Sequence, residues 1–169
     1  MRIVGAVLAF AACIYAGFIR LCSLKERETC LDAAAESLMH IRNSMDRTNA
    51  ALPEIFSALS RHCSGQAGRF FALLAEQADC IGERRMQEIW VETVRHVFTE
   101  LDDRESNELI KLGYILGGSD CQTQLREIES CEKSLEAALN ALRHELPEKK
   151  KLALGLSATA GAFTVILLI

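Results

Sequence analysis

Apolar residues recur at three- and four-residue intervals along most of the chain, which is the spacing of one face of an α-helix. The first stripe of this kind begins after Leu24 and is made of Leu31, Ala34, Leu38, Ile41 and Met45. A second helix is predicted to begin at Pro53, because the N–H group that proline lacks has no partner in the first turn of a helix. Its apolar face is formed by Ile55, Phe56 and Leu59.

In the middle of the chain, two glycines indicate a loop and the only tryptophan indicates a buried helix face. Residues 64–68 contain two glycines, which make a continuous helix costly, so this stretch is predicted to be a loop. A short and strongly apolar helix follows, and a fourth helix is predicted after Gly82. Trp90, the only tryptophan, lies on the apolar face of this fourth helix, so we expect it to be a core residue.

A fifth helix is predicted between two carboxylates and two glycines. Asp102 and Asp103 are placed to accept hydrogen bonds from its first amides, and Gly117 and Gly118 are expected to end it. Gly113 lies inside this helix, where glycine costs about 1 kcal/mol relative to alanine. We therefore expect Gly113 to let another helix approach closely.

A sixth helix completes the pattern. It is predicted to begin at Ser119, whose spacing from Gln122 fits a capping box, and to end near Pro147. Six amphipathic helices without strand-like alternation predict an all-α fold, a six-helix antiparallel bundle. An even number of antiparallel helices returns the chain to the end at which it entered.

Two uncharged runs flank the bundle, 3–19 and 152–169. Each would be about 25 Å long as a helix, close to the ~30 Å hydrocarbon thickness of a bilayer. The sequence therefore predicts transmembrane helices at 1–22 and 151–169, with a bundle domain at 23–150. Two alternatives stay open: the first run as a signal or lipoprotein segment that is cleaved, and the second as a buried core helix.

Basic residues predict the orientation in the membrane. Arg20, Lys25 and Arg27 follow the first run, and Lys149 to Lys151 precede the second. This bias places the bundle in the cytoplasm and both termini across the membrane. The seven cysteines are an odd number without a regular spacing, which agrees with a reducing compartment.

The charge and the motifs exclude several classes of function. The chain has 23 acidic and 19 basic residues, so a nucleic-acid partner is not expected. His62-Cys63 is the only close pair of soft metal ligands, and one pair cannot complete a zinc site. No Cys-x-x-Cys, His-Glu-x-x-His or phosphate-binding glycine loop occurs. We therefore predict no catalytic residue, no metal site and no cofactor, and a protein that is not an enzyme.

Several segments together carry a resemblance to a known family. They are a helix start at Leu52-Pro53-Glu54, the segment Leu112-Gly113-x-x-Leu116-Gly117-x-Ser119-Asp120, and a final apolar run that ends Val165-Ile166-Leu167-Leu168-Ile169. In this order and spacing, the chain resembles the stage III sporulation protein AB family of spore-forming bacteria over its whole length.

The resemblance implies a specific role. The family is similar to the cytoplasmic domain of the F-type platform proteins of type II secretion and type IV pilus machines. It implies a membrane component of the channel complex between mother cell and forespore, required for sporulation, in the outer forespore membrane with its bundle in the mother-cell cytoplasm. The implied partners are the AAA-type ATPase, stage III sporulation protein AA, and other stage III sporulation membrane proteins. Platform proteins carry two such domains, so this chain is expected to form a homo-oligomer.

The candidate interaction residues are those of the shared segment. Gly113, Gly117, Ser119 and Asp120 are predicted either to contact a partner or simply to build a stable helix-turn-helix. The alternative function is a transmembrane helical sensor domain, which the cytoplasmic placement of the bundle disfavours. A membrane enzyme ranks third.

Overall fold

The structure, a computed structural model, describes residues 2–48, 50–78, 84–116, 118 and 120–168. Within 2–20 and 148–168 it describes solvent exposure only at Tyr15, Phe18, Ile19, Lys151, Gly155 and Thr159. Gly117 and Ser119, two of the four candidate interaction residues, lie outside the described part of the chain.

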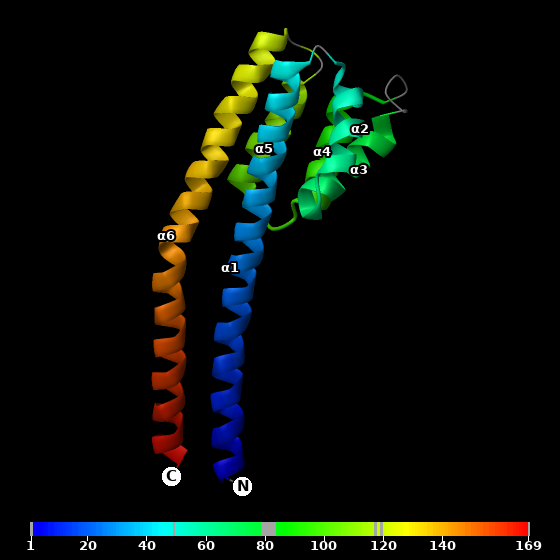
Figure 1. Ribbon diagram of the computed structural model, residues 1–169. Coiled ribbons are helices and arrows are strands. Elements are labelled where there is room, and N and C mark those ends of the chain that lie inside the picture. The colour runs from blue at the N-terminus through cyan, green and yellow to red at the C-terminus, as the bar shows by residue number, and fades with distance from the viewer. Residues whose placement is uncertain (1, 49, 79–83, 117, 119, 169) are drawn as a thin grey trace. The chain divides into compact units, whose positions relative to one another are not determined.

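The described residues form six α-helices and no sheet (Figure 1). The helices are α1 (Arg2–Arg47), α2 (Leu52–His62), α3 (Gly65–Ala78), α4 (Met86–Val97), α5 (Asp103–Ile115) and α6 (Cys121–Leu168). The predicted all-α class and the number of helices are confirmed. Helix α1 also runs without interruption from the first apolar run into the first stripe.

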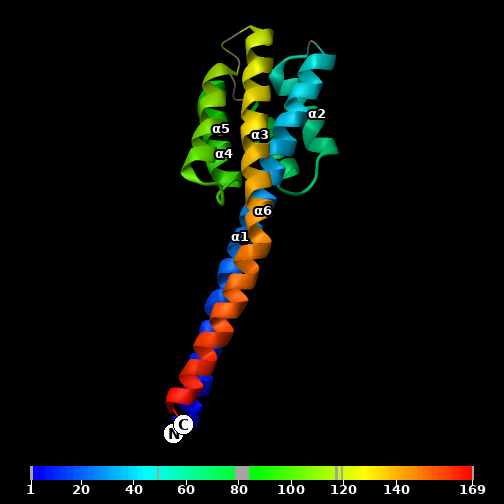
Figure 2. The ribbon, with the colours of Figure 1, turned by 90° about the vertical axis from the view of Figure 1, so that its left-hand side faces the viewer.

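The chain divides into two compact units. The terminal unit contains residues 1–28 and 140–169, and the helical domain contains residues 29–139. In the terminal unit, the beginning of α1 and the end of α6 lie side by side and antiparallel (Figures 1 and 2). Arg143 Nε lies 2.9 Å from Glu28 Oε1 and links the two helices within this unit.

The membrane spans are a separate question. No helix among the described residues is both long enough and apolar enough to cross a bilayer. The transmembrane helices at 1–22 and 151–169 stay predictions.

The helical domain has one apolar core. Helix α2 packs on α3, α3 on α4, and α4 on α5. All five residues of the predicted α1 stripe are buried, as are the three on α2, so both predicted faces are confirmed. An aromatic cluster occupies the centre, with neighbouring ring centroids 5.0–6.5 Å apart, and consists of Phe56, Phe70, Phe71, Trp90 and Phe98.

The loop predicted at 64–68 is wrong, because α3 already begins at Gly65. Gly65 has a φ of +65°, a left-handed conformation that glycine adopts without steric cost, and the helix starts there. Gly68 is inside the first turn, where a Cβ atom would lie 2.6 Å from the carbonyl oxygen of Cys63. The second glycine therefore allows a close backbone contact and does not interrupt the helix.

The predicted helix end near Pro147 is also wrong. Helix α6 continues through Pro147 to Leu168. Proline lacks the N–H that would donate to the carbonyl of the residue four positions earlier, and its ring crowds that carbonyl. A long helix can retain its other hydrogen bonds around that point.

Candidate functional site: surfaces of the helical domain

Gly113 lies where α5 meets α4. A Cβ atom at Gly113 would lie 2.4 Å from Cδ1 and 2.8 Å from Cγ of Trp90, far closer than carbon atoms approach each other. The absence of a side chain at Gly113 therefore brings the α5 backbone onto the indole ring. This is the close helix approach that the sequence predicts for Gly113.

Trp90 is also held to α5 by a hydrogen bond. Its side chain is fully buried, and its Nε1–H donates to the carbonyl oxygen of Leu109 at 2.8 Å. A buried indole N–H without a partner would cost about 1–3 kcal/mol, so this bond favours one position of α4 against α5. Gly113 and Trp90 thus have a structural role inside the domain, and Gly113 itself is buried.

Asp120 occupies a different position, at the start of α6. Its Oδ2 accepts a hydrogen bond from the Thr123 amide at 3.0 Å, and its Oδ1 accepts one from Thr123 Oγ1 at 2.8 Å. These bonds, with the backbone amides around them, hold the pKa of Asp120 below its ordinary value of 3.8. Helix α6 begins at Cys121, so Asp120 occupies the capping position. The predicted capping pair, Ser119 and Gln122, includes Ser119, which lies outside the described residues.

We expect Asp120→Ala to lower the melting temperature of the protein by a few degrees at neutral pH, because an amide at the start of α6 loses its acceptor. The group has a lowered pKa in the folded state, so its contribution is present above its ordinary pKa and is lost as the pH falls through the folded pKa. Thermal melts of the variant and the wild type, followed by circular dichroism, should therefore differ at pH 7 and converge below pH 3.8. A difference that persists unchanged in acid would contradict this role for the carboxylate.

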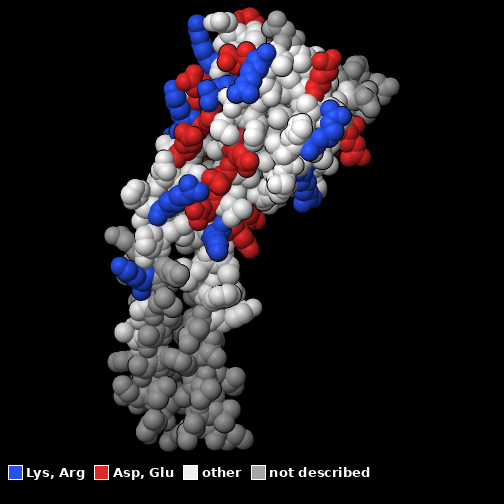
Figure 3. Space-filling view, viewed as in Figure 1, with Lys and Arg blue, Asp and Glu red and all other residues white. Residues whose placement is uncertain are grey.

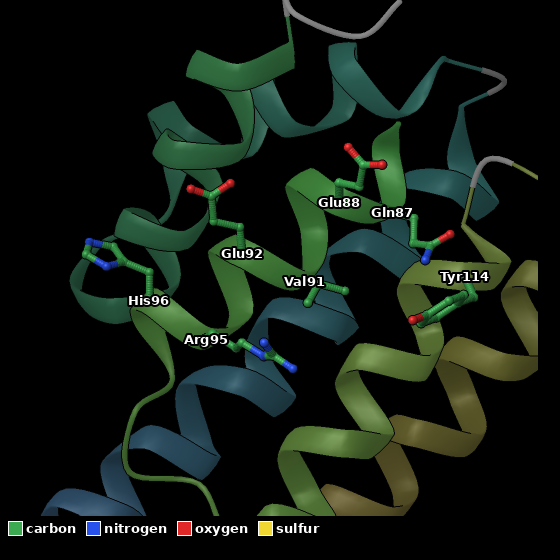
Figure 4. Close-up of a pocket in the computed structure, with 7 residues that line it drawn as sticks. All are labelled: Gln87, Glu88, Val91, Glu92, Arg95, His96 and Tyr114. Carbon is green, nitrogen blue, oxygen red and sulfur yellow. The ribbon is translucent and has the colours of Figure 1, made fainter. Parts of the chain in front are cut away.

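A groove of about 560 Å³ lies on the outer face of α4 beside Tyr114 of α5 (Figure 4). It is lined by Gln87, Glu88, Val91, Glu92, Arg95, His96 and Tyr114. In Figure 4, Tyr114 and Gln87 lie on one side of Val91, and Glu92 and His96 lie on the other. Among the exposed large apolar side chains described in the helical domain, Tyr114 is the most exposed, at 61%, which makes this groove the first candidate for contact with another protein.

The charged residues of this groove differ in how they are paired. Arg84 Nη2 lies 2.6 Å from Glu92 Oε2, and Arg69 Nη2 lies 3.2 Å from His96 Nε2. Among the described residues, no ion pair or hydrogen bond involves the side chain of Glu88 or Arg95. These two charges are therefore available to a partner.

Two smaller grooves lie elsewhere on the helical domain. One, of about 390 Å³, lies between α1 and α2 and includes His40, Arg47 and Glu54. The other, of about 270 Å³, lies between α5 and α6 and includes Glu108, Lys111 and Cys131. On the face viewed in Figure 3, described Lys and Arg side chains are interspersed with Asp and Glu and do not gather into one basic area.

The buried thiols are unsuited to nucleophilic chemistry. Burial raises the pKa of Cys131 to about 12, with a further contribution from the nearby Glu108 and Glu127 carboxylates. Burial also raises the pKa of Cys30. Thiolates are the reactive form, so both side chains behave as small apolar residues. Within the described part of the chain, no three His, Cys, Asp or Glu side chains are grouped to hold a metal ion.

Comparison with known protein families identifies the family of this chain. A family model described as stage III sporulation protein AB matches residues 2–169. The chain belongs to the stage III sporulation protein AB family. The resemblance inferred from the sequence motifs is thereby confirmed, and membership gives the chain a role in sporulation. The family is not a known enzyme family.

A solved structure has the same fold as this member of the stage III sporulation protein AB family. The solved protein is named "Stage III sporulation protein AB (SpoIIIAB)" and is 18% identical to this chain. The two superpose with a TM-score of 0.62 over 72% of this chain and 96% of that one. At this identity the likeness shows the fold alone. No significant match to an individual curated protein accompanies it.

Sequence reasoning missed the α4–α5 groove of this family member. One signal for it was available: Leu109, Leu112 and Leu116 place the buried face of α5, and Tyr114 falls outside that face. Helical spacing alone could not show that Tyr114 lies beside Val91 on another helix. The grouping of these residues into one groove is therefore visible only in the tertiary structure.

Proposed function

We propose that this chain is a non-enzymatic membrane component of the sporulation channel complex between mother cell and forespore. Its helical domain would act as a platform on which a cytoplasmic ATPase of the stage III sporulation system docks. Family membership supports the sporulation role. The finer role rests on the resemblance to F-type platform proteins and on the arrangement of the helices.

The observation that carries the proposal is the path of the chain through the helical domain. Helices α1 and α6 cross this domain in opposite directions, and Arg42 of α1 lies beside Glu132 of α6, with Nε 2.8 Å from Oε2. The end of α1 and the start of α6 consequently lie at one end of the domain (Figure 1). The residues at which the chain enters and leaves the domain lie at the opposite end. A platform needs this separation between an anchored end and a free end.

The terminal unit supports the anchoring part of the proposal. The antiparallel pairing of α1 and α6, linked by Glu28 and Arg143, is the arrangement that two adjacent membrane spans at 1–22 and 151–169 require. The flanking Arg and Lys residues favour a helical domain in the mother-cell cytoplasm. The ATPase would then bind the end of the domain formed by the α1–α2 and α5–α6 connections.

Arg47 tests this docking end. It is exposed in the last turn of α1, and no ion pair involves it among the described residues. We expect Arg47→Glu to weaken capture of the purified stage III sporulation ATPase by the full chain at least tenfold, because reversing one contact charge costs about 1.4 kcal/mol or more. Binding is measured by titration on immobilised full chain in detergent.

Arg61 is the matched control. It is equally exposed but lies in the last turn of α2, which ends at the opposite end of the helical domain. Arg61→Glu should bind the ATPase as the wild type does. Equal loss in both variants, or no binding by the wild type at high micromolar concentration, would reject the docking proposal. Labelling of the exposed Cys121 from outside intact cells by an impermeant maleimide would instead favour a sensor that faces outward.

A further inference from the structure

The groove on α4 carries charges of opposite sign toward its two ends. Glu88 and Arg95 are seven residues apart, which is about two helical turns and about 10 Å, so both point from the same face of α4. Val91 lies between them. Figure 4 shows Glu88 beyond one end of Val91 and Arg95 beyond the other. The face therefore presents a negative charge, an apolar centre and a positive charge in line.

The neighbouring charges do not disturb this pattern. Glu92 and His96 lie on the side of α4 away from Tyr114, where Arg84 and Arg69 contact them. Glu88 and Arg95 are exposed and have no such contact among the described residues. Of the charged side chains that line the groove, the two without a partner among the described residues are thus the two placed on either side of the apolar centre.

The apolar part of the groove also lacks a cover among the described residues. Tyr114 of α5 is 61% exposed beside the half-buried Val91. Removing an exposed ring and a neighbouring aliphatic side chain from water is favourable, so another surface that covers them is stabilised by the hydrophobic effect. Tyrosine is also among the residues that most often dominate the energy of protein interfaces.

A surface with opposite charges at similar distances from an apolar centre is complementary to itself. A two-fold rotation about an axis through that centre exchanges the two ends, so each charge faces the opposite charge of the other copy. We propose that the α4–α5 groove binds the same groove of a second copy of this chain. Helix α4 then lies antiparallel to its counterpart, with Glu88 of each copy against Arg95 of the other and Val91 and Tyr114 at the centre.

The limited extent of the α4–α5 groove limits the strength of the contact between two copies. Stable interfaces bury about 800 Å² and involve about 20–30 residues on each partner. Seven residues line this groove. We therefore expect a dimer that exchanges and depends on concentration. The inference does not depend on the proposed ATPase docking, because that partner would bind the end of the helical domain and not the outer face of α4.

Site-specific crosslinking tests the contact in the full chain. Val91→Cys places a thiol close to the two-fold axis, and Ala72→Cys places one on the exposed face of α3 as a matched control. Both variants are purified in detergent and treated with a short bis-maleimide, and the unsubstituted chain gives the background from the natural cysteines. We expect Val91→Cys to yield at least fivefold more crosslinked dimer than Ala72→Cys.

Charge reversal then tests the pairing. In the Val91→Cys background, Glu88→Arg or Arg95→Glu should each reduce the crosslinked dimer at least fivefold, because each change sets like charges against each other on both sides of the axis. A mixture of the two charge variants should restore the yield, since every contact between a Glu88→Arg chain and an Arg95→Glu chain joins opposite charges. Glu76→Arg on α3 is the charge-reversal control and should leave the yield unchanged.

Three results would overturn the inference. They are a Val91→Cys yield no higher than that of Ala72→Cys across the whole concentration series, a yield insensitive to the charge variants, and a failure of the mixture to restore it. The last result would indicate a different protein on this groove. Circular dichroism melts check that the charge variants fold. A small decrease in melting temperature is expected for each, because Glu88 lies in the first turn of α4 and Arg95 in its last turn, where their charges are favourable to the helix dipole.

Discussion

Gly113→Val is expected to destabilise the helical domain by about 3 kcal/mol, which is the upper end of the usual cost of overpacking a core. The first added carbon would lie 2.4 Å from Cδ1 of Trp90, and the indole cannot withdraw, because it is fully buried and hydrogen-bonded to Leu109. Either α5 moves away from α4 or Trp90 leaves its position. Either movement disrupts the packing of Trp90 against α5.

Chemical denaturation of the full chain, followed by tryptophan fluorescence, measures this effect at the site itself. The chain has one tryptophan, so the emission of Trp90 reports directly on its burial. We also expect Gly113→Ala to be intermediate. Alanine recovers about 1 kcal/mol of helix propensity but still adds the clashing Cβ atom.

Gly118→Val is the matched control. A Cβ atom at Gly118 would meet only the carbonyl oxygen of Tyr114, at an ordinary distance of 3.8 Å, and Gly118 does not have a left-handed φ. We expect a change of less than about 1 kcal/mol, within the range of ordinary surface substitutions. If Gly118→Val and Gly113→Val were equally destabilising, the contact with Trp90 would not be the cause.

Arg42→Met is expected to destabilise the same domain by about 1–3 kcal/mol. Arg42 is partly exposed, whereas the side chain of Glu132 is only 8% exposed. Arg42 contacts both carboxylate oxygens, with Nε 2.8 Å from Oε2 and Nη2 3.3 Å from Oε1. Removing the guanidinium would leave a negative charge in a nearly dry position between α1 and α6.

A double-mutant cycle separates this pairing from other effects of the substitution. Glu132→Leu should cost less than Arg42→Met, because the freed Arg42 can still reach water. The double variant should recover most of the stability lost in Arg42→Met, since it leaves no unpaired charge. Equilibrium unfolding of the four proteins gives the coupling energy, and strictly additive effects would show that the pair contributes no interaction of its own.

Local sequence signals were sufficient for much of the fold. The α1 stripe was predictable because five apolar residues at helical spacing have only one common direction in which to be buried. Trp90 was predictable as a core residue because the apolar positions around it belong to the same face. The start of α5 was predictable because Asp102, with Glu105 three residues later, forms a capping box.

Other positions could not be read from local signals. Gly65 and Gly68 suggested a loop, but one glycine begins α3 and the other provides room for the Cys63 carbonyl, and composition does not distinguish these uses. Pro147 suggested a helix end, but α6 continues past it. In each case a single residue type is compatible with two backbone conformations, and neighbouring structure selects one of them.

For the candidate surfaces, the features that the sequence determines are clearly distinct from those that only the tertiary structure decides. The sequence by itself determined the number of helices, the family and the need for a close helix contact at Gly113, because these depend on spacing along the chain. Only the tertiary structure decided that Trp90 is the residue at that contact, that Arg42 pairs with Glu132, and that Tyr114 lies beside the charges of α4. Those pairs join segments up to 90 residues apart, and contacts at such distances are set by how the helices pack together.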